Sequence, residues 1–291
     1  MTDTNIDIDE LQKWIGKSET GEERIASFPS NALAATLDRD DPHYEDGTSL
    51  PPLWHWLHFL PIFQRSDAGY DGHAALGQFL PPVPLPRRMW AGSRIRFLAP
   101  MRIGQTLRKV SIVHSVEHKH GRSGDLVFVT VRHQIFDGET LGIEEEHDIV
   151  YREAPDPDKV SPVSQQAPTT SAFSRAVLPD PVLLFRYSAL TFNGHRIHYD
   201  KPFCTNTEGY GGLVVHGPLL ATMLLDLLRC EIPDATVQTF EFRAISTVFD
   251  NHNFSVHGQP EPDGKTIQLW VTRHDGALVM TATATISEDI R

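Results

Sequence analysis

The residues best suited to chemistry lie close together between Phe185 and Asp200, in the segment FRYSALTFNGHRIHYD. Asn193, His195 and His198 are near neighbours there, and Gly194 permits a sharp turn of the chain. A histidine can act as a general base near neutral pH, and an amide can hold a water or orient an imidazole. The chain contains 15 histidines, so a single histidine indicates little. Their clustering with an amide is what favours a functional site.

A second candidate is the segment 209–229 (GYGGLVVHGPLLATMLLDLLR), in which glycines precede an apolar helix. Pro218 suits the first turn of a helix, because its missing N–H would have no partner there. A helix start also presents unpaired N–H groups and the positive end of the helix dipole. Backbone N–H groups around His216 and Gly217 could therefore stabilise an oxyanion that develops on a carbonyl group. The same segment also fits a buried core helix, and both interpretations can hold together.

A third candidate is a run of arginines that begins after a proline-rich segment (FLPPVPLPRR), which we expect to be extended. The arginines are Arg87, Arg88, Arg94, Arg96, Arg102 and Arg108. They could bind phosphates or a carboxylate, and a solvated strand face would explain them nearly as well. The sequence has no Walker loop, dinucleotide fingerprint, G-x-S-x-G elbow or H-E-x-x-H helix. His195 and His198 lack the companions of a zinc site, so we predict no metal and no cofactor.

The hydrophobic pattern predicts α+β elements to position these candidates. Short helices are expected over Pro29–Asp40 and Pro181–Leu190. A long apolar helix is expected over Pro218–Arg229, and the aromatic-rich segment Leu50–Phe63 is its possible counterpart in the first half. Alternating residues rich in Val, Ile, Phe and Thr predict antiparallel strands. These strands span Arg94–Phe97, Thr106–Glu117, Asp125–Asp137, Leu141–Tyr151, Thr236–Ala244, Asn253–Gln259, Thr266–Thr272 and Ala277–Ile286.

The clearest change in composition falls over residues 153–170, EAPDPDKVSPVSQQAPTT, which are rich in proline and small polar residues. We interpret this stretch as a linker. It separates a first half, residues 1–152, from a second half, residues 171–291, each the size of a domain. Both halves contain a helix followed by a meander. The repetition predicts a tandem duplication in which a long helix packs on a curled sheet in each half.

The overall composition excludes several classes of protein. The chain of 291 residues has 26 basic and 38 acidic residues, and its net charge of −12 argues against nucleic acid as the main partner. The apolar stretch Gly212–Leu228 contains His216, Pro218 and Asp226, so no membrane span is expected. An acidic N-terminus and only two cysteines fit neither a secretory signal nor a disulfide framework. We therefore expect a cytosolic protein.

The segments ALTFNGHRIHYD and GLVVHGPLLATMLLDLL together resemble the hydratase 2, or MaoC-like, branch of the hot-dog superfamily. The usual pattern of that family is Ser/Thr-Gly-Asp-x-Asn-Pro-Leu-His, followed by a His-Gly start to the central helix. Thr191 falls on the Ser/Thr, Asn193 on the aspartate, His195 on the asparagine and His198 on the histidine. Segments of the first half (ALAATLD, LPPLWHW and GQFLPPVPLPRRMWAG) resemble the N-terminal half of the same proteins. The resemblance covers nearly the whole chain and implies a double hot-dog fold.

Among these proteins, the chain is most similar to the mesaconyl-CoA and itaconyl-CoA hydratases. The resemblance implies a hydro-lyase that adds water to such a branched CoA thioester to give citramalyl-CoA, with His198 as the acid/base and Asn193 orienting the water. It also implies an acyl-CoA partner and a homo-oligomer. The residues expected to bind substrate are His195, Arg196, Gly212, Val215, His216 and Gly217. Arg186, Arg196 and Arg243 are the candidates for holding the free carboxylate of a dicarboxyl substrate.

Asn193 departs from the family pattern, because an amide cannot act as a base where the family has an aspartate. Three alternatives stay open, and the last of them follows from this departure. The protein could be a straight-chain 3-hydroxyacyl thioester dehydratase or a hot-dog thioesterase. It could also be a non-catalytic subunit that binds acyl-CoA.

Overall fold

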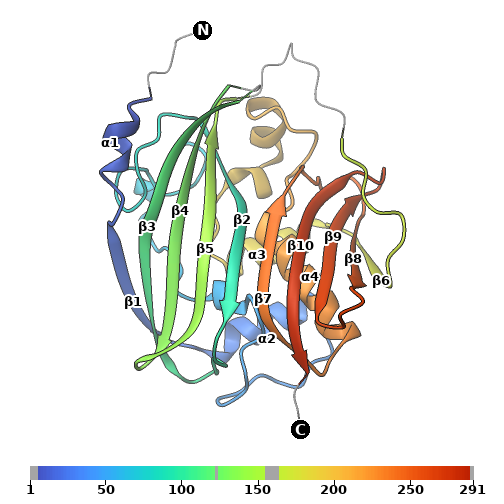
Figure 1. The fold of residues 1–291 in the computed structure, drawn as a ribbon. Helices are drawn as coiled ribbons and strands as arrows, with labels where there is room; N and C mark the ends of the chain where they lie inside the picture. Colours follow the sequence, from blue (N-terminus) through green and yellow to red (C-terminus); the bar gives the residue numbers. More distant parts are fainter. Residues whose placement is uncertain (1–5, 122–123, 155–163, 289–291) are drawn as a thin grey trace.

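The computed structural model describes residues 6–121, 124–154 and 164–288, and its ten strands form one antiparallel sheet. The order across the sheet is β1-β3-β4-β5-β2-β7-β10-β9-β8-β6 (Figure 1). The strands of the first half are β1 (Ser18–Arg24), β2 (Arg87–Phe97), β3 (Thr106–Gly121), β4 (Gly124–Asp137) and β5 (Thr140–Arg152). Those of the second half are β6 (Phe173–Val177), β7 (Ala235–Ala244), β8 (Phe254–Pro260), β9 (Thr266–Arg273) and β10 (Leu278–Glu288). Both predicted meanders are confirmed.

The two halves meet where β2 pairs with β7. Ser93 lies opposite Phe242 and Ile95 opposite Phe240, so the sheet continues across the junction without a break. The predicted linker, residues 153–170, lies partly outside the described residues. Among the described residues, no helix is long and apolar enough to cross a membrane.

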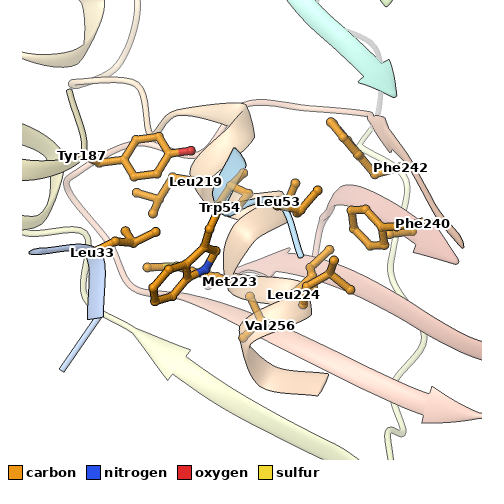
Figure 2. Close-up of a cluster of buried hydrophobic side chains, with 14 of the residues drawn as sticks. Leu33, Leu53, Trp54, Tyr187, Leu219, Met223, Leu224, Phe240, Phe242 and Val256 are labelled. Carbon is orange, nitrogen blue, oxygen red and sulfur yellow. The ribbon is translucent and has the colours of Figure 1, made fainter. Parts of the chain in front are cut away.

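The longest helix of the described chain is α4 (Gly217–Glu231), which packs on the sheet of the second half (Figure 1). The predicted helices α2 (Ser27–Thr36), α3 (Pro181–Leu190) and α4 are all confirmed. Their apolar side chains and those of the sheet form one core, drawn in Figure 2. It includes Leu33, Leu53, Trp54, Tyr187, Leu219, Met223, Leu224, Phe240, Phe242 and Val256. Residues from both halves thus share one interior.

The first half does not have the long helix that the sequence analysis expected. Within residues 50–63 the structure has only a 3-10 turn, η1 (Trp54–Leu57). Prolines at positions 51, 52 and 61 restrict the helix, because proline lacks an N–H and clashes with the preceding turn. Leu53 and Phe59 moreover have positive φ angles of 69° and 54°. Trp54 is buried and Trp56 is partly buried, and both reach the core from a compact loop.

The remaining elements are short. They are α1 (Ile8–Gln12) and η2 (Arg65–Asp67) in the first half, and η3 (Arg196–His198) and the π-helical turn η4 (Phe203–Thr207) in the second. The proline-rich segment before β2 is extended as predicted: Val83 and Leu85 are buried, while Pro82, Pro84 and Pro86 point outward. This segment helps to cover a second, smaller core over β3, β4 and β5.

Candidate active site

The candidate loop follows helix α3 and runs toward the start of α4. Asp180 caps the beginning of α3 by accepting two backbone N–H groups. Phe192, with a φ of 48°, turns the chain out of the helix in a left-handed conformation. The chain then enters η3, which brings His198 against His216 at the N-cap of α4. The two segments that the sequence analysis singled out therefore form one site.

His198 is held in one tautomer by the backbone. Its Nδ1 lies 2.7 Å from the carbonyl oxygen of Val214, so Nδ1–H donates and Nε2 keeps its lone pair. The ring is 7% exposed. Burial lowers the pKa of His198 to about 4, although the bond to Val214 opposes this effect. At neutral pH the residue is an uncharged base with Nε2 available to accept a proton.

The ring of His216 packs against that of His198. The two rings stack with their centroids 3.7 Å apart, and His216 Nε2 lies 2.7 Å from the Ser188 hydroxyl. Burial lowers the pKa of His216 well below its usual range. Because its side chain is fully buried, His216 fixes the position of His198 through packing.

The other residues expected around the start of α4 differ in how much space surrounds them. Gly217 faces open space, since no atom lies within 4 Å of the place a Cβ would occupy. Val215 is buried and donates its backbone N–H to Val248, 2.9 Å away. A Cβ on Gly212 would lie 2.5 Å from an Asp250 oxygen. Gly217 is thus the residue of these three with open space beside its Cα atom.

Asn193 and His195 form a tight turn beside His198. The Asn193 side-chain oxygen accepts the backbone N–H of His195 at 3.0 Å, which leaves the amide nitrogen for other contacts. The ring of His195 meets that of His198 edge-on, with centroids 5.3 Å apart. Arg196 turns away and bonds to Asp200 through Nε at 3.0 Å and Nη2 at 2.8 Å. The loop thus brings His195 and His198 together and ties Arg196 to a neighbouring carboxylate.

The structure adds two residues that the sequence analysis missed, Asp71 and His73 from the first half. Asp71 Oδ2 lies 2.8 Å from His73 Nδ1 and 4.0 Å from His195 Nε2. The rings of His73 and His195 lie 4.0 Å apart. A signal was present in the sequence: Tyr-Asp-Gly-His at 70–73 matches Phe-Asn-Gly-His at 192–195 in residue type.

The surroundings of Asp71, His73 and His195 determine the protonation state of each side chain. Burial would raise the pKa of Asp71, but hydrogen bonds from His73 outweigh it and hold that pKa well below its usual range. Burial lowers the pKa of His73 and of His195, and the positive charge of Arg88 adds to both effects. At neutral pH the cluster therefore contains an anionic carboxylate beside neutral imidazoles.

A cavity opens beside this cluster. It is lined in part by Tyr70, Asp71, Arg87, Arg88, His195 and Tyr210. Arg87 lies 3.3 Å from Glu208 and 4.8 Å from the Tyr210 ring, so its charge is already paired. Among the described residues, no carboxylate forms an ion pair with Arg88, which is half-buried. Arg88 therefore presents a positive charge to the cavity.

The other arginines of that run are used elsewhere. Arg94 bonds to Glu146 and Asp148, and Arg96 bonds to Glu144, all on the exposed face of the sheet. Arg102 donates to the Gly47 carbonyl oxygen at 2.8 Å, and Arg108 lies over the Phe136 ring. The solvated-face interpretation thus holds for Arg94 and Arg96, but not for Arg88.

The ligand atoms of Asp71, His73 and His195 lie within 4.8 Å of one another, close enough to surround a metal ion. In this structure, however, Asp71 and His73 bond directly to each other. The expectation of no metal stays a prediction.

Comparison with known proteins identifies the same family over most of the chain. The family model for hydroxyacyl-thioester dehydratase type 2 matches residues 53–250. Mesaconyl-C(4)-CoA hydratase of Chloroflexus aurantiacus is 47% identical over 270 residues, which cover 93% of this chain and 95% of the relative. The resemblance inferred from the sequence is confirmed.

Solved structures share the fold. A MaoC-like dehydratase from Phytophthora capsici matches with a TM-score of 0.72 at 13% identity, covering 98% of this chain and 99% of the other. A Mycobacterium tuberculosis protein with a double hot-dog fold gives 0.60 at 15% identity, covering 96% of this chain and 98% of the other. The predicted double hot-dog fold is confirmed.

Proposed function

Because the chain belongs to the hydroxyacyl-thioester dehydratase type 2 family and is a hydro-lyase, we propose that it hydrates a short branched unsaturated CoA thioester. The substrate is mesaconyl-CoA or itaconyl-CoA, and the product is citramalyl-CoA. The relative from C. aurantiacus, which is named for a mesaconyl-CoA substrate, supports this choice. The observation that carries the mechanism is the free Nε2 of His198, fixed by the Val214 carbonyl.

His198 acts as both base and acid in this reaction. Its Nε2 takes a proton from water while the water oxygen bonds to the β-carbon of the thioester. In mesaconyl-CoA with its thioester at C4, the double bond is conjugated with the thioester carbonyl, so its electron pair moves through the α-carbon to the thioester oxygen, where the backbone N–H of Gly217 at the start of α4 stabilises the negative charge. Itaconyl-CoA has its double bond one carbon further from the thioester, so His198 would first move a proton from the α-carbon to the terminal methylene carbon, which gives the same conjugated thioester. The imidazolium of His198 then returns the proton to the α-carbon. The sum is the addition of one water.

Arg88 is the residue best placed to hold the free carboxylate of a dicarboxyl substrate. It lines the cavity with His195 and has no carboxylate partner among the described residues. Two of the arginines proposed from the sequence, Arg186 and Arg243, are exposed, and the third, Arg196, is bonded to Asp200. We therefore transfer the proposed role from those arginines to Arg88.

Hydration of a straight-chain thioester is the second candidate, because the family itself is described by hydroxyacyl-thioester dehydration. The same His198 chemistry would serve that substrate, but it offers no carboxylate for Arg88. Substrate preference therefore separates the two functions. We also propose that the protein is a homo-oligomer in the cytosol. The oligomeric state and the compartment are proposed from the sequence analysis alone.

The test measures loss of double-bond absorbance with mesaconyl-, itaconyl- and crotonyl-CoA, and identifies products by mass. We expect hydration of a dicarboxyl thioester and little action on crotonyl-CoA. Arg88→Leu should lower kcat/KM for the dicarboxyl thioester roughly 10- to 100-fold, the value of a charged hydrogen bond, and crotonyl-CoA turnover far less. Arg186→Leu, exposed on α3, is the matched control. Strong crotonyl-CoA turnover, with equal losses on both substrates in Arg88→Leu, would move the function to the straight-chain dehydratases.

A further inference from the structure

We propose that Asp71 supplies the carboxylate that Asn193 does not, so that the first half of the chain completes the active site of the second. This inference rests on the proposed hydratase function and assigns a further catalytic residue to it. Asn193 stands where the family pattern has an aspartate, and an amide has no basic or anionic group to offer. The site nevertheless contains a carboxylate, which comes from the other half.

The two halves contribute matching turns. In the first, Asp71 Oδ1 accepts the backbone N–H of His73 at 3.0 Å. In the second, Asn193 Oδ1 accepts the backbone N–H of His195 at the same distance of 3.0 Å. Both turns have glycine in the middle and an aromatic residue before the acid or amide. The carboxylate and the amide therefore hold equivalent positions in two copies of one local structure.

The turns pack directly on each other. The N–H of Arg196 donates to the carbonyl oxygen of Asp71 at 2.8 Å, and its guanidinium donates to the carbonyl oxygen of Tyr70 at 2.9 Å. Gly72 has a φ of +89°, and a Cβ there would lie 2.0 Å from the carbonyl oxygen of Gly194. This close approach needs glycine at position 72. The position of Asp71 is therefore fixed relative to the histidine loop by backbone contacts.

The carboxylate is accessible as well as fixed. The Asp71 side chain is 20% exposed and lines the same cavity as His195. A row of imidazole rings leads away from Asp71 through the site. The ring centroids of His73 and His195 are 4.0 Å apart, and those of His195 and His198 are 5.3 Å apart. His73, His195 and Tyr70 interact electrostatically with this carboxylate, and Arg88 and His198 act on its histidine partners.

The chemistry assigned to Asp71 is to hold the attacking water, a role that the sequence analysis gave to Asn193. One hydrogen of that water donates to the Asp71 carboxylate, while the other faces His198 Nε2. As the oxygen bonds to the β-carbon, the O–H bond toward His198 breaks and its proton moves to Nε2. The negative charge of Asp71 then stabilises the imidazolium that forms, until His198 returns the proton to the α-carbon. Asp71 ends the cycle unprotonated.

The experiment compares Asp71→Asn with Asp67→Asn, an exposed carboxylate in the same loop. Asparagine keeps the acceptor for the His73 N–H, so the turn should survive. We expect Asp71→Asn to lower kcat about 100-fold with less than a threefold change in KM, within the range for loss of a proton-transfer partner. Asp67→Asn should retain wild-type kcat. The double variant Asp71→Asn/Asn193→Asp, which restores a carboxylate in the other turn, should recover at least tenfold of the loss.

Hydration by the wild type is measured first, so the proposed function stands or fails separately from the role of Asp71. Wild-type kcat in Asp71→Asn would overturn that role while leaving the hydratase intact. A loss that comes with a lower melting temperature, and that Asn193→Asp does not reverse, would show a structural residue instead. Activity abolished by EDTA and restored by Zn²⁺ would also overturn the inference, because the carboxylate would then be a metal ligand.

Discussion

Glu145 and Asp71 both lie beside histidines, but their surroundings differ. Glu145, inside the first half, is 3% exposed. Its Oε2 accepts hydrogen bonds from His55 Nε2 at 3.2 Å and Trp56 Nε1 at 3.0 Å, and its Oε1 accepts the Ser93 hydroxyl at 2.8 Å. Asp71, between the halves, instead has His73 as its close partner and opens onto a cavity.

These surroundings determine what each carboxylate can do. Glu145 belongs to a polar row in which Ser111, His133 and Glu145 lie opposite one another on β3, β4 and β5. Glu145 is enclosed and its two oxygens accept three donors, so the carboxylate is a structural anion that stabilises buried polar groups. Each Asp71 oxygen has one donor, from His73, but the side chain is 20% exposed and lines the cavity, so it can accept a further hydrogen bond from a water or substrate. Histidines beside a carboxylate therefore do not by themselves identify the reactive site.

The largest difference between the two clusters should be in kcat, when one histidine is removed from each of them in turn. His198→Ala should lower kcat roughly 10²- to 10⁴-fold, because it deletes the group that moves the proton. His147, which interacts electrostatically with Glu145, has its ring tilted against that of Trp90 with centroids 3.9 Å apart, and His147→Ala should leave kcat within a few fold. Steady-state kinetics on the best thioester decides this. Near-normal turnover in His198→Ala would remove the basis for the assignment.

A smaller effect, on stability, should come from Glu145→Gln. The amide nitrogen would face donors such as Trp56 Nε1, and a buried donor left without an acceptor costs about 1–3 kcal/mol. The free energy of unfolding from urea titration should fall by about that amount, while kcat per folded molecule should stay within twofold. A loss of kcat at unchanged stability would instead mean that the first-half cluster takes part in catalysis.

The smallest effect concerns pH, where the two clusters should behave alike. Burial lowers the pKa of His147 and of His198 to about 4. Between about pH 6.5 and 4 the unfolded chain takes up protons that the folded protein refuses, so stability falls as pH falls. Each histidine contributes at most about 1.4 kcal/mol per pH unit. Replacing either by Gln should reduce the difference in unfolding free energy between pH 7 and pH 5. No reduction in either variant would show that these rings titrate normally.

Local patterns in the sequence predicted much of this structure. Helix α3 begins at Pro181 and ends at Leu190, as its proline start and apolar spacing indicated. The charged, mostly exposed strand β1 (SETGEER) was missed because an edge strand of this kind has no apolar alternation. The long helix of the first half was wrongly expected from hydrophobicity, which the flanking prolines override.

The candidate site was partly predictable for the same reason. Asn193, His195 and His198 are adjacent in sequence, so their clustering was visible directly. Asp71 lies far from them along the chain, in a segment without periodicity, and it is brought near by tertiary contacts, namely the packing of Gly72 on Gly194 and the hydrogen bonds from Arg196. Contacts that depend on tertiary structure leave no spacing to recognise, although the repeated Asp/Asn-Gly-His pattern was a usable clue.

The pairing of β2 with β7 also has a consequence for how this site can change by mutation. An assembly of two identical chains carries every substitution twice, once on each side of its symmetry axis. Here both hot-dog units are encoded in one chain, so each half can vary without altering its counterpart. The first half can therefore have the short turn η1 and an aspartate, while the second has the long helix α4 and an asparagine. The asymmetry of the site depends on this independence.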